Sequence, residues 1–265
     1  MNNKELLSIA IEASIKAGKA IIEVYESDDF GIEVKGDKSP LTKADIAADK
    51  IIRFFLARTD IPILSEEGKD IPYETRKNWD YLWIVDPIDG TKEFINKTGE
   101  FTVNIALIND RSTVFGIVAA PVSGKIWHGS VLDKQHEVDS VPETIRIVMS
   151  KSHKNENDEK FLEFLDMNNV QYQTVEKGSS LKLCSLADNE ADIYSRFGPT
   201  SEWDIAAAHA VLNSCGGSVI NIKEETELDY AKKSTILNPY FMAFRNKALE
   251  NEFLDLLRDF FKKLV

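Results

Sequence analysis

The sequence predicts an α+β or α/β protein of layered helices and sheets, organised as two halves. Residues 4–26 and 247–264 repeat apolar side chains at helical spacing, which predicts two amphipathic helices. Residues 101–131 contain three β-rich runs joined by short turns, which indicates an antiparallel meander. After residue 144, strand-like and helix-like segments alternate, as is typical of an α/β unit.

Two helices and two short strands are expected before the central motif. The first helix, residues 4–26, is expected to pack into the core. The second helix begins after Thr42, which can cap it, and Asp45 lies in its first turn, where a carboxylate compensates the helix dipole. Short strands are expected at residues 32–35 and 61–64.

The central motif follows an apolar run. Residues 81–85 are typical of a buried strand, and we expect the strand to end at Pro87 because proline cannot donate to a β-ladder. A turn there can aim the carboxylates of Asp86 and Asp89 at one point, where they repel each other unless a cation lies between them. Mg²⁺ suits such a site because it binds oxygen ligands and keeps several waters.

The residues after the two aspartates favour phosphate binding. Gly90 lets a backbone approach closely, and the following N–H groups can hold a phosphate at the start of a helix capped by Thr91. Taken alone, an Asp-x-x-Asp pair favours a strand followed by an Asx-type turn with solvated aspartates. The apolar run, the proline and the Gly-Thr pair together favour the metal and phosphate interpretation.

The second half is expected to be an α/β unit. Composition changes at residues 132–143, so we place the boundary there and divide the chain into residues 1–135 and 136–265. The expected strands are residues 144–149, 170–175 and 191–197, and the expected helix between the first two is residues 159–167. The last helix, residues 247–264, is expected to serve core packing only.

Other acidic and polar residues lie at the ends of predicted elements. Glu66 and Glu67 follow a strand and form either an acidic loop or metal ligands. Asp204 lies in the first turn of a helix that begins after Ser201, and it either completes a capping box or holds a second cation. A loop of glycine and serine with a nearby lysine can hold a phosphate or a sugar. The residues of this loop are Gly178, Ser179, Ser180 and Lys182.

These motifs resemble those of a known phosphatase superfamily. The central motif resembles the signature of the lithium-sensitive, magnesium-dependent phosphatases that include inositol monophosphatase: Asp86-Pro87-Ile88-Asp89-Gly90-Thr91. Residues 92–95 and 99–106 are similar to the 3'(2'),5'-bisphosphate nucleotidase branch, of the CysQ type. Trp203-Asp204, followed by small residues, resembles the second signature of the superfamily. The resemblance implies a layered α-β-α-β-α sandwich with the site in a cleft between the halves.

The resemblance also implies roles for particular residues. Two or three Mg²⁺ ions would be held by Glu66, Asp86, Ile88 through its carbonyl, Asp89 and Asp204. Glu67 and the pair of Asp45 and Thr91 would orient the attacking water. The implied substrate contacts are Glu66, Ile88, Asp89, Gly90, Thr91, Ser150, His153, Gly178, Ser179, Ser180, Lys182, Arg196 and Asp204.

The implied reaction is hydrolysis of adenosine 3',5'-bisphosphate (PAP) to AMP and phosphate in sulfate assimilation. The sulfated analogue PAPS, which would give APS, is a second candidate substrate, and inhibition by lithium and calcium is implied in the same way. Three alternatives remain. Inositol monophosphatase uses the same chemistry on another substrate. An aspartyl-phosphate phosphatase is disfavoured, because Asp86 and Asp89 are three residues apart rather than two. A non-catalytic metal or nucleotide sensor is disfavoured by the complete set of acidic residues.

Composition limits the partners. The net charge of −12 argues against a nucleic-acid polymer or an anionic membrane as the main partner, but not against a small anionic nucleotide. No transmembrane span and no signal peptide are expected, and Cys184 and Cys215 fit a reducing compartment. We therefore expect a cytoplasmic monomer or homodimer, and the composition leaves open peripheral association with the inner face of the membrane.

Overall fold

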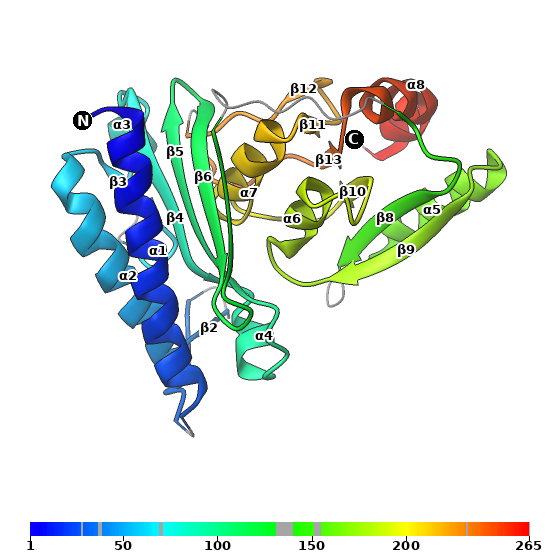
Figure 1. Cartoon of the computed structure of the whole chain (residues 1–265). Helices are drawn as coiled ribbons and strands as arrows, with labels where there is room; N and C mark the ends of the chain where they lie inside the picture. The colour runs from blue at the N-terminus through cyan, green and yellow to red at the C-terminus, as the bar shows by residue number, and fades with distance from the viewer. Residues whose placement is uncertain are drawn as a thin grey trace.

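The structure is a computed structural model that describes residues 1–27, 29–36, 39–68, 71–130, 140–150, 155–231 and 233–264. Its elements form alternating layers of helix, sheet, helix, sheet and helix (Figure 1). Three clusters of buried apolar side chains fill the spaces between the layers. The predicted α-β-α-β-α sandwich is therefore confirmed.

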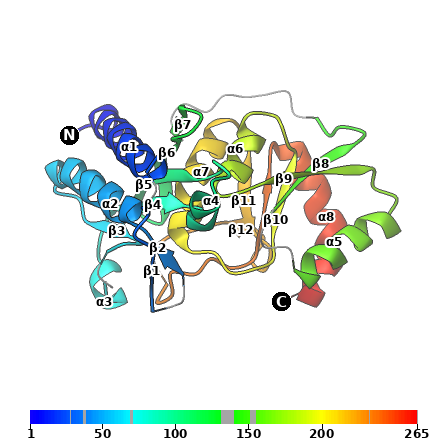
Figure 2. The same cartoon turned by 90° about the horizontal axis from the view of Figure 1, so that it is seen from below.

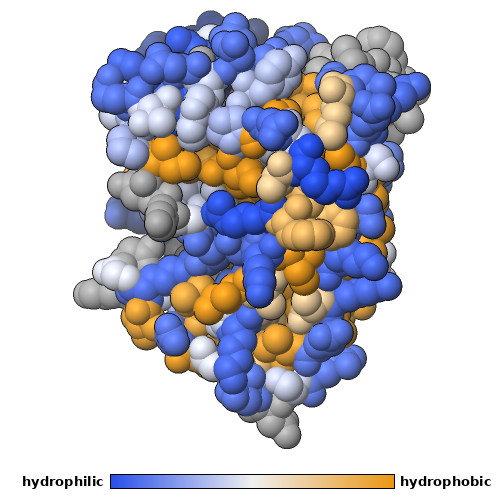
Figure 3. All heavy atoms as spheres, turned by 90° about the vertical axis from the view of Figure 1, so that its left-hand side faces the viewer, coloured by the Kyte–Doolittle hydropathy of each residue, from blue (hydrophilic) through white to orange (hydrophobic). Residues whose placement is uncertain are grey.

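The first layer contains α1 (Asn3–Tyr25) and α2 (Lys43–Leu56), which ends in the 3-10 turn η1 (Ala57–Thr59). Figure 2 shows the two long helices side by side. Both helices begin with a capping box. In this motif the side chain of the N-cap residue accepts a hydrogen bond from the backbone N–H three residues later, and the side chain of that later residue accepts one from the N-cap N–H. The side of the molecule shown in Figure 3 has both hydrophilic and apolar areas. Ile46 and Phe54 of α2 are exposed apolar side chains. The short strands β1 (Glu33–Val34) and β2 (Pro40–Leu41) connect the helices.

The first sheet is built from the first half of the chain. Its order is β3 (Ile63–Ser65), β4 (Tyr81–Asp89), β5 (Thr102–Asn109), β6 (Ser112–Ala120) and β7 (Lys125–Ser130). Strands β3 and β4 are parallel, and the other neighbouring pairs are antiparallel. Strands β5 to β7 are the predicted meander. A short helix that the sequence did not predict, α3 (Tyr73–Arg76), precedes β4.

Strand β4 is longer than the sequence predicted. We expected it to end at Pro87, but it continues to Asp89. Asp86 pairs with Asn104 and Asp89 pairs with Thr102, so β4 contains one more residue than β5 over this interval. This is a bulge, and proline is tolerated there because the unpaired residue needs no N–H for the ladder. The bulge places the two aspartates of the motif within the strand rather than after it.

The middle layer contains α6 (Leu181–Ala187) and α7 (Glu202–Ser214), and α7 lies against the first sheet. Two glycines of the sheet allow this close approach. A Cβ atom on Gly116 would lie 2.1 Å from the Ala207 carbonyl oxygen, and one on Gly129 would lie 2.1 Å from Ser214 Oγ. Helix α7 is buried on nearly all sides, as expected for a helix between two sheets. Its first turn, with Asp204, is thereby held near the end of β4.

The second sheet has the order β12 (Thr226–Glu227), β11 (Ser218–Asn221), β13 (Phe241–Phe244), β10 (Ile193–Arg196), β8 (Ile145–Ser150) and β9 (Tyr172–Lys177). Strands β8, β9 and β10 are parallel, and the remaining pairs are antiparallel. Its outer face is covered by α5 (Glu156–Met167) and α8 (Lys247–Leu264), which form the last layer (Figure 2).

The second half was predicted only in part. The expected strands β8 to β10 and the helices α5 and α8 are present, and α6 is the helix expected, without stated bounds, before the strand at residues 191–197, whereas β11, β12 and β13 were not predicted. The missed strands are short, and α6 begins within the stretch that we expected to be a glycine-serine loop. The predicted boundary between residues 135 and 136 lies outside the described residues and stays a prediction.

Candidate active site

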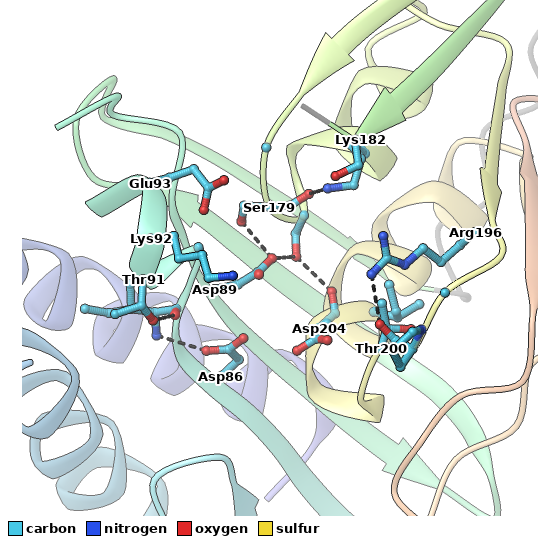
Figure 4. A pocket seen from close by; sticks show the side chains of 18 of the residues that line it. Asp86, Asp89, Thr91, Lys92, Glu93, Ser179, Lys182, Arg196, Thr200 and Asp204 are labelled. Carbon is cyan, nitrogen blue, oxygen red and sulfur yellow. Dashed lines mark hydrogen bonds between the residues drawn. The ribbon is translucent and has the colours of Figure 1, made fainter. Parts of the chain in front are cut away.

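A cavity of about 880 Å³ opens where β4, α6 and α7 meet (Figure 4). It is lined by residues of both sheets and of the middle layer. Of the site residues proposed from the sequence, the cavity is lined by Glu66, Asp86, Ile88, Asp89, Gly90, Thr91, Ser150, Gly178, Ser179, Ser180, Lys182, Arg196 and Asp204. His153 lies outside the described residues. Asp45 and Glu67 are close to the lining residues but do not line the cavity.

Three carboxylates converge at one end of the cavity. Asp86, Asp89 and Asp204 each offer an oxygen, and these oxygens lie within 4.8 Å of one another. Burial and the neighbouring Glu66 raise the pKa of Asp86 well above its usual range. Burial and the neighbouring Asp89 raise the pKa of Asp204 to about 8. Carboxylates packed this closely are stabilised by a cation, and an all-oxygen donor set fits a hard divalent ion such as Mg²⁺.

Local hydrogen bonds hold two of these aspartates in place. The Ile88 N–H donates to Asp86 Oδ1 at 3.0 Å, which closes an Asx-type turn across the bulge of β4. The Ser201 N–H donates to Asp204 Oδ2 at 2.9 Å, as part of the capping box of α7. The two interpretations that the sequence left open for Asp204 are therefore compatible, because the residue caps its helix and also belongs to the acidic cluster.

Asp45 is brought to the Gly-Thr turn by the packing of α2 against β4. Gly90 has φ +94°, a left-handed conformation that favours glycine, and α4 (Thr91–Ile95) follows it. Thr91 Oγ1 lies 3.5 Å from Asp45 Oδ1 and 3.4 Å from the Ile88 carbonyl oxygen. The other carboxylate oxygen of Asp45 accepts the Thr42 N–H at 2.7 Å. Burial raises the pKa of Asp45.

Glu66 and Glu67 follow β3 and share a lysine that the sequence analysis did not single out. Lys35 Nζ lies 2.8 Å from Glu66 Oε1 and 2.5 Å from Glu67 Oε1. Burial raises the pKa of Glu67 to about 7. Both glutamates contact Lys35. Glu66 also lies close enough to Asp86 to raise the pKa of that aspartate. Nothing in the sequence indicates this contact, because Lys35 and Glu66 are 31 positions apart.

Side chains of α6 and β10 form a cationic end of the cavity beside the acidic cluster. Lys182 is buried, and its Nζ donates to the Ser179 carbonyl at 2.7 Å and lies 5.7 Å from the centre of the Tyr194 ring. Burial lowers the pKa of Lys182. Arg196, at the end of β10, donates to the Pro199 carbonyl at 2.8 Å. Within the described part of the chain its Nε is buried without a hydrogen-bond partner. Buried donors with unused capacity favour an anionic ligand here.

Several lining residues were missed by the sequence analysis. They are Ser39, Pro40, Lys92, Glu93, Asn155, Leu183, Tyr194, Gly198, Pro199, Thr200 and Ile205. Some lie next to the motifs, such as Lys92, Glu93 and Ile205, and others, such as Ser39, Pro40 and Asn155, come from segments without a recognisable motif. Tyr194 could have been noticed as an aromatic residue two positions before Arg196, because alternate residues of a strand face the same side.

Comparison with known proteins agrees with this geometry. Residues 2–258 match the model of the inositol monophosphatase family. The chain belongs to the inositol monophosphatase family.

Two named relatives within this family are the 3'(2'),5'-bisphosphate nucleotidases CysQ of Salmonella typhimurium and Escherichia coli K12. The chain is 42% identical to the first over 249 residues and 41% identical to the second over 250 residues. Each match covers 89% of this chain and 98% of the relative. The resemblance to the CysQ-type branch, inferred from the motifs, is confirmed.

A solved structure shows the same family fold. The crystal structure of CysQ from Bacteroides thetaiotaomicron, a bacterial member of the inositol monophosphatase family, superimposes with a TM-score of 0.82. The two sequences are 35% identical, and the match covers 92% of this chain and 99% of the other. In the described part of this family member, no helix combines the length and the apolarity that crossing a membrane requires.

Proposed function

We propose that this protein is a Mg²⁺-dependent phosphatase that hydrolyses adenosine 3',5'-bisphosphate to AMP and phosphate, with the sulfated analogue as a second candidate substrate. The main support is a single cavity with two ends that suit anions in different ways. An acidic cluster suited to divalent cations forms one end, and Lys182 and Arg196 form the cationic end beside it. A nucleotide with two separate phosphates matches both ends. The names of the CysQ relatives support the same substrate.

Mg²⁺ would be held by the carboxylates of the acidic cluster, together with Glu66 and the carbonyl of Ile88. When bound, such ions neutralise charge on the phosphoryl group and activate a water for attack. Thr91 can accept a hydrogen bond from this water while donating its own proton to Asp45, which orients the water in line with the phosphorus. Glu67, beside Lys35, is the second group proposed to orient the water. The N–H groups of Gly90 and Thr91 would hold the scissile phosphate.

The cationic end would hold the second phosphate. Lys182 and Arg196 can donate to phosphate oxygens, and the loop of Gly178 and Ser179, with Ser150 on the neighbouring strand, would contact the nucleoside. An inositol monophosphate has one phosphate and would leave the buried Lys182 and the half-buried Arg196 without an anionic partner, which disfavours the inositol alternative. We further propose that the protein acts in the cytoplasm, where the reducing conditions fit its two cysteines.

The test is phosphate release from a panel of substrates with Mg²⁺ and with EDTA. The panel contains adenosine 3',5'-bisphosphate, its sulfated analogue, 3'-AMP and inositol 1-phosphate. We expect Mg²⁺-dependent release and a kcat/KM for the adenosine bisphosphate at least about tenfold above that for inositol 1-phosphate. Faster hydrolysis of inositol 1-phosphate would refute the substrate assignment, and no release from any substrate would refute the enzymatic proposal.

Variants connect the activity to the site. Asp89→Ala and Asp45→Ala should each abolish turnover while circular dichroism shows an unchanged fold, because each removes a carboxylate from the proposed machinery. Asp255→Asn, on the exposed face of α8, is the matched control and should retain full activity. Near-normal phosphate release by either of the first two variants would contradict the assignment.

A further inference from the structure

The loop before α6 contacts the acidic cluster directly. Ser179 Oγ lies 2.7 Å from Asp89 Oδ2, and Ser180 Oγ lies 2.8 Å from the same oxygen. The Thr102 hydroxyl lies 2.8 Å from Ser179 Oγ and extends the chain of hydroxyl groups to β5. Both serine hydroxyls therefore contact the same carboxylate oxygen, Oδ2 of Asp89. Figure 4 shows Ser179 beside Asp89.

Ser180 also contacts the other element that supplies the cluster. Its Oγ lies 2.9 Å from the backbone carbonyl oxygen of Asp204, in the first turn of α7. The hydroxyl has one proton and can donate it to either acceptor, of which the carboxylate is the stronger. With 3% of its surface exposed, Ser180 is packed between the end of β4 and the start of α7. These two elements come from different halves of the chain and supply all three carboxylates.

The hydroxyl of Ser180 is not used to cap its own helix. Ser180 occupies the N-cap position of α6, where serine usually accepts a hydrogen bond from a backbone N–H of the first turn. Here its backbone is helical, with φ −65° and ψ −8°, and the side chain makes no capping hydrogen bond. Ser179, just before it, has φ +51°, a conformation that residues other than glycine rarely adopt. The loop is thus held in a shape that directs both hydroxyls to Asp89 instead of to α6.

We infer that Ser180 is a positioning residue that fixes Asp89 relative to the start of α7 and thereby arranges the carboxylates for cation binding. This inference rests on the proposed metal-dependent function, and it differs from the substrate contact that the sequence resemblance implied for Ser180. A metal ligand that is held by hydrogen bonds is already oriented when the ion arrives. Loss of such a partner typically lowers metal affinity by 10- to 100-fold.

The test compares two serine-to-alanine variants of the full chain. Ser180→Ala removes the hydroxyl from the cluster. Ser185→Ala is the matched control, because Ser185 lies in α6, which Ser180 precedes, is also buried, and among the described residues donates at 2.7 Å only to the Lys182 carbonyl. Mn²⁺, which binds oxygen ligands like those of Mg²⁺, is titrated into protein that EDTA has freed of metal, and free Mn²⁺ is followed by electron paramagnetic resonance.

We expect Ser180→Ala to weaken Mn²⁺ binding by about tenfold or more, while Ser185→Ala binds like the wild type. In the turnover assay, the Mg²⁺ concentration for half-maximal rate should rise in the same proportion, whereas the substrate KM at saturating Mg²⁺ should change by less than about twofold. Ser180→Cys, which replaces the hydroxyl by a weak donor of similar shape, should show the same loss and serves if Ser180→Ala folds poorly.

Other results would overturn the inference. Wild-type Mn²⁺ affinity in Ser180→Ala, equal weakening in both alanine variants, or a rise of the substrate KM without a change in metal affinity would each exclude a positioning role. These outcomes leave the proposed function intact. Its failure is recognised separately, because the wild-type protein would then bind no Mn²⁺ and release no phosphate.

Discussion

Replacing Lys182 by methionine should show how much the cationic end of the cavity contributes to substrate binding, independently of the acidic end. The side chain of Lys182 is buried, and its ammonium group has three donors. Among the residues that the structure describes, it makes one hydrogen bond, to the Ser179 carbonyl. The other donors are available to a phosphate. Methionine keeps an unbranched side chain of similar length and removes the charge. Burial lowers the pKa of Lys182, so the substitution removes a desolvated cation, and circular dichroism checks that the variant is folded.

The expected loss follows from the strength of a hydrogen bond to a charged group. Such a bond contributes about 1.5–3 kcal/mol, which corresponds to a factor of about 10 to 150. We therefore expect Lys182→Met to lower kcat/KM for adenosine 3',5'-bisphosphate by this factor. The value for 3'-AMP, which has no 5'-phosphate, should stay within about threefold, because that substrate loses no contact. Phosphate release measured with both nucleotides gives the ratio directly.

The matched control is Lys177→Met. Lys177 ends β9, lies 3.5 Å from Glu190 and does not line the cavity, so neither substrate should be affected. An equal loss of kcat/KM for both nucleotides in Lys182→Met would mean that the lysine acts on the scissile phosphate or on the fold. No loss for either nucleotide would mean that the second phosphate does not bind at this end. Both results would refute the two-ended cavity.

Three further predictions concern stability. Gly116→Ala should lower the free energy of unfolding by about 1–3 kcal/mol in denaturant titration and reduce activity, because its Cβ would lie 2.1 Å from the backbone of α7. Asp192→Asn should lower the free energy of unfolding by about 3–5 kcal/mol, because Arg146 and Arg245 would lose their buried counter-charge. Asp259→Asn, which removes one partner of an exposed ion pair, should leave the free energy of unfolding unchanged. The pKa of Asp192 is held below its usual range by these arginines despite burial, so its stabilisation should be present above about pH 4 and fade as the pH falls further, which urea titration at several pH values will show. Mg²⁺ at about 100 times its Kd should raise the melting temperature by about 5 °C or more over EDTA, since it relieves repulsion in the acidic cluster, and an unchanged melting temperature would argue against a metal site.

Some of the candidate site could be predicted because its signals are local. Asp86 and Asp89 belong to one short motif, whose apolar run, proline and Gly-Thr pair together indicate a metal and phosphate site. The capping box of Thr42 and Asp45 was predicted for the same reason, because hydrogen bonds three residues apart depend on few neighbours. The roles of Glu66, Glu67 and Asp204 came from the resemblance, since adjacent acidic residues at an element end are also typical of solvated loops and helix caps.

The sequence by itself determined α1 and α8, whose apolar side chains recur with a regular helical period, and the strands β5 to β7, which are β-rich runs joined by short turns. Both signals depend only on neighbouring residues. Only the tertiary structure decided how these elements meet. The bulge that keeps Pro87 within β4 depends on pairing with β5, and the place of Asp204 depends on α7 lying against Gly116. The contacts of Lys35 with Glu66 and of Ser180 with Asp89 join residues far apart in the chain, so packing between layers, rather than local propensity, brings them together.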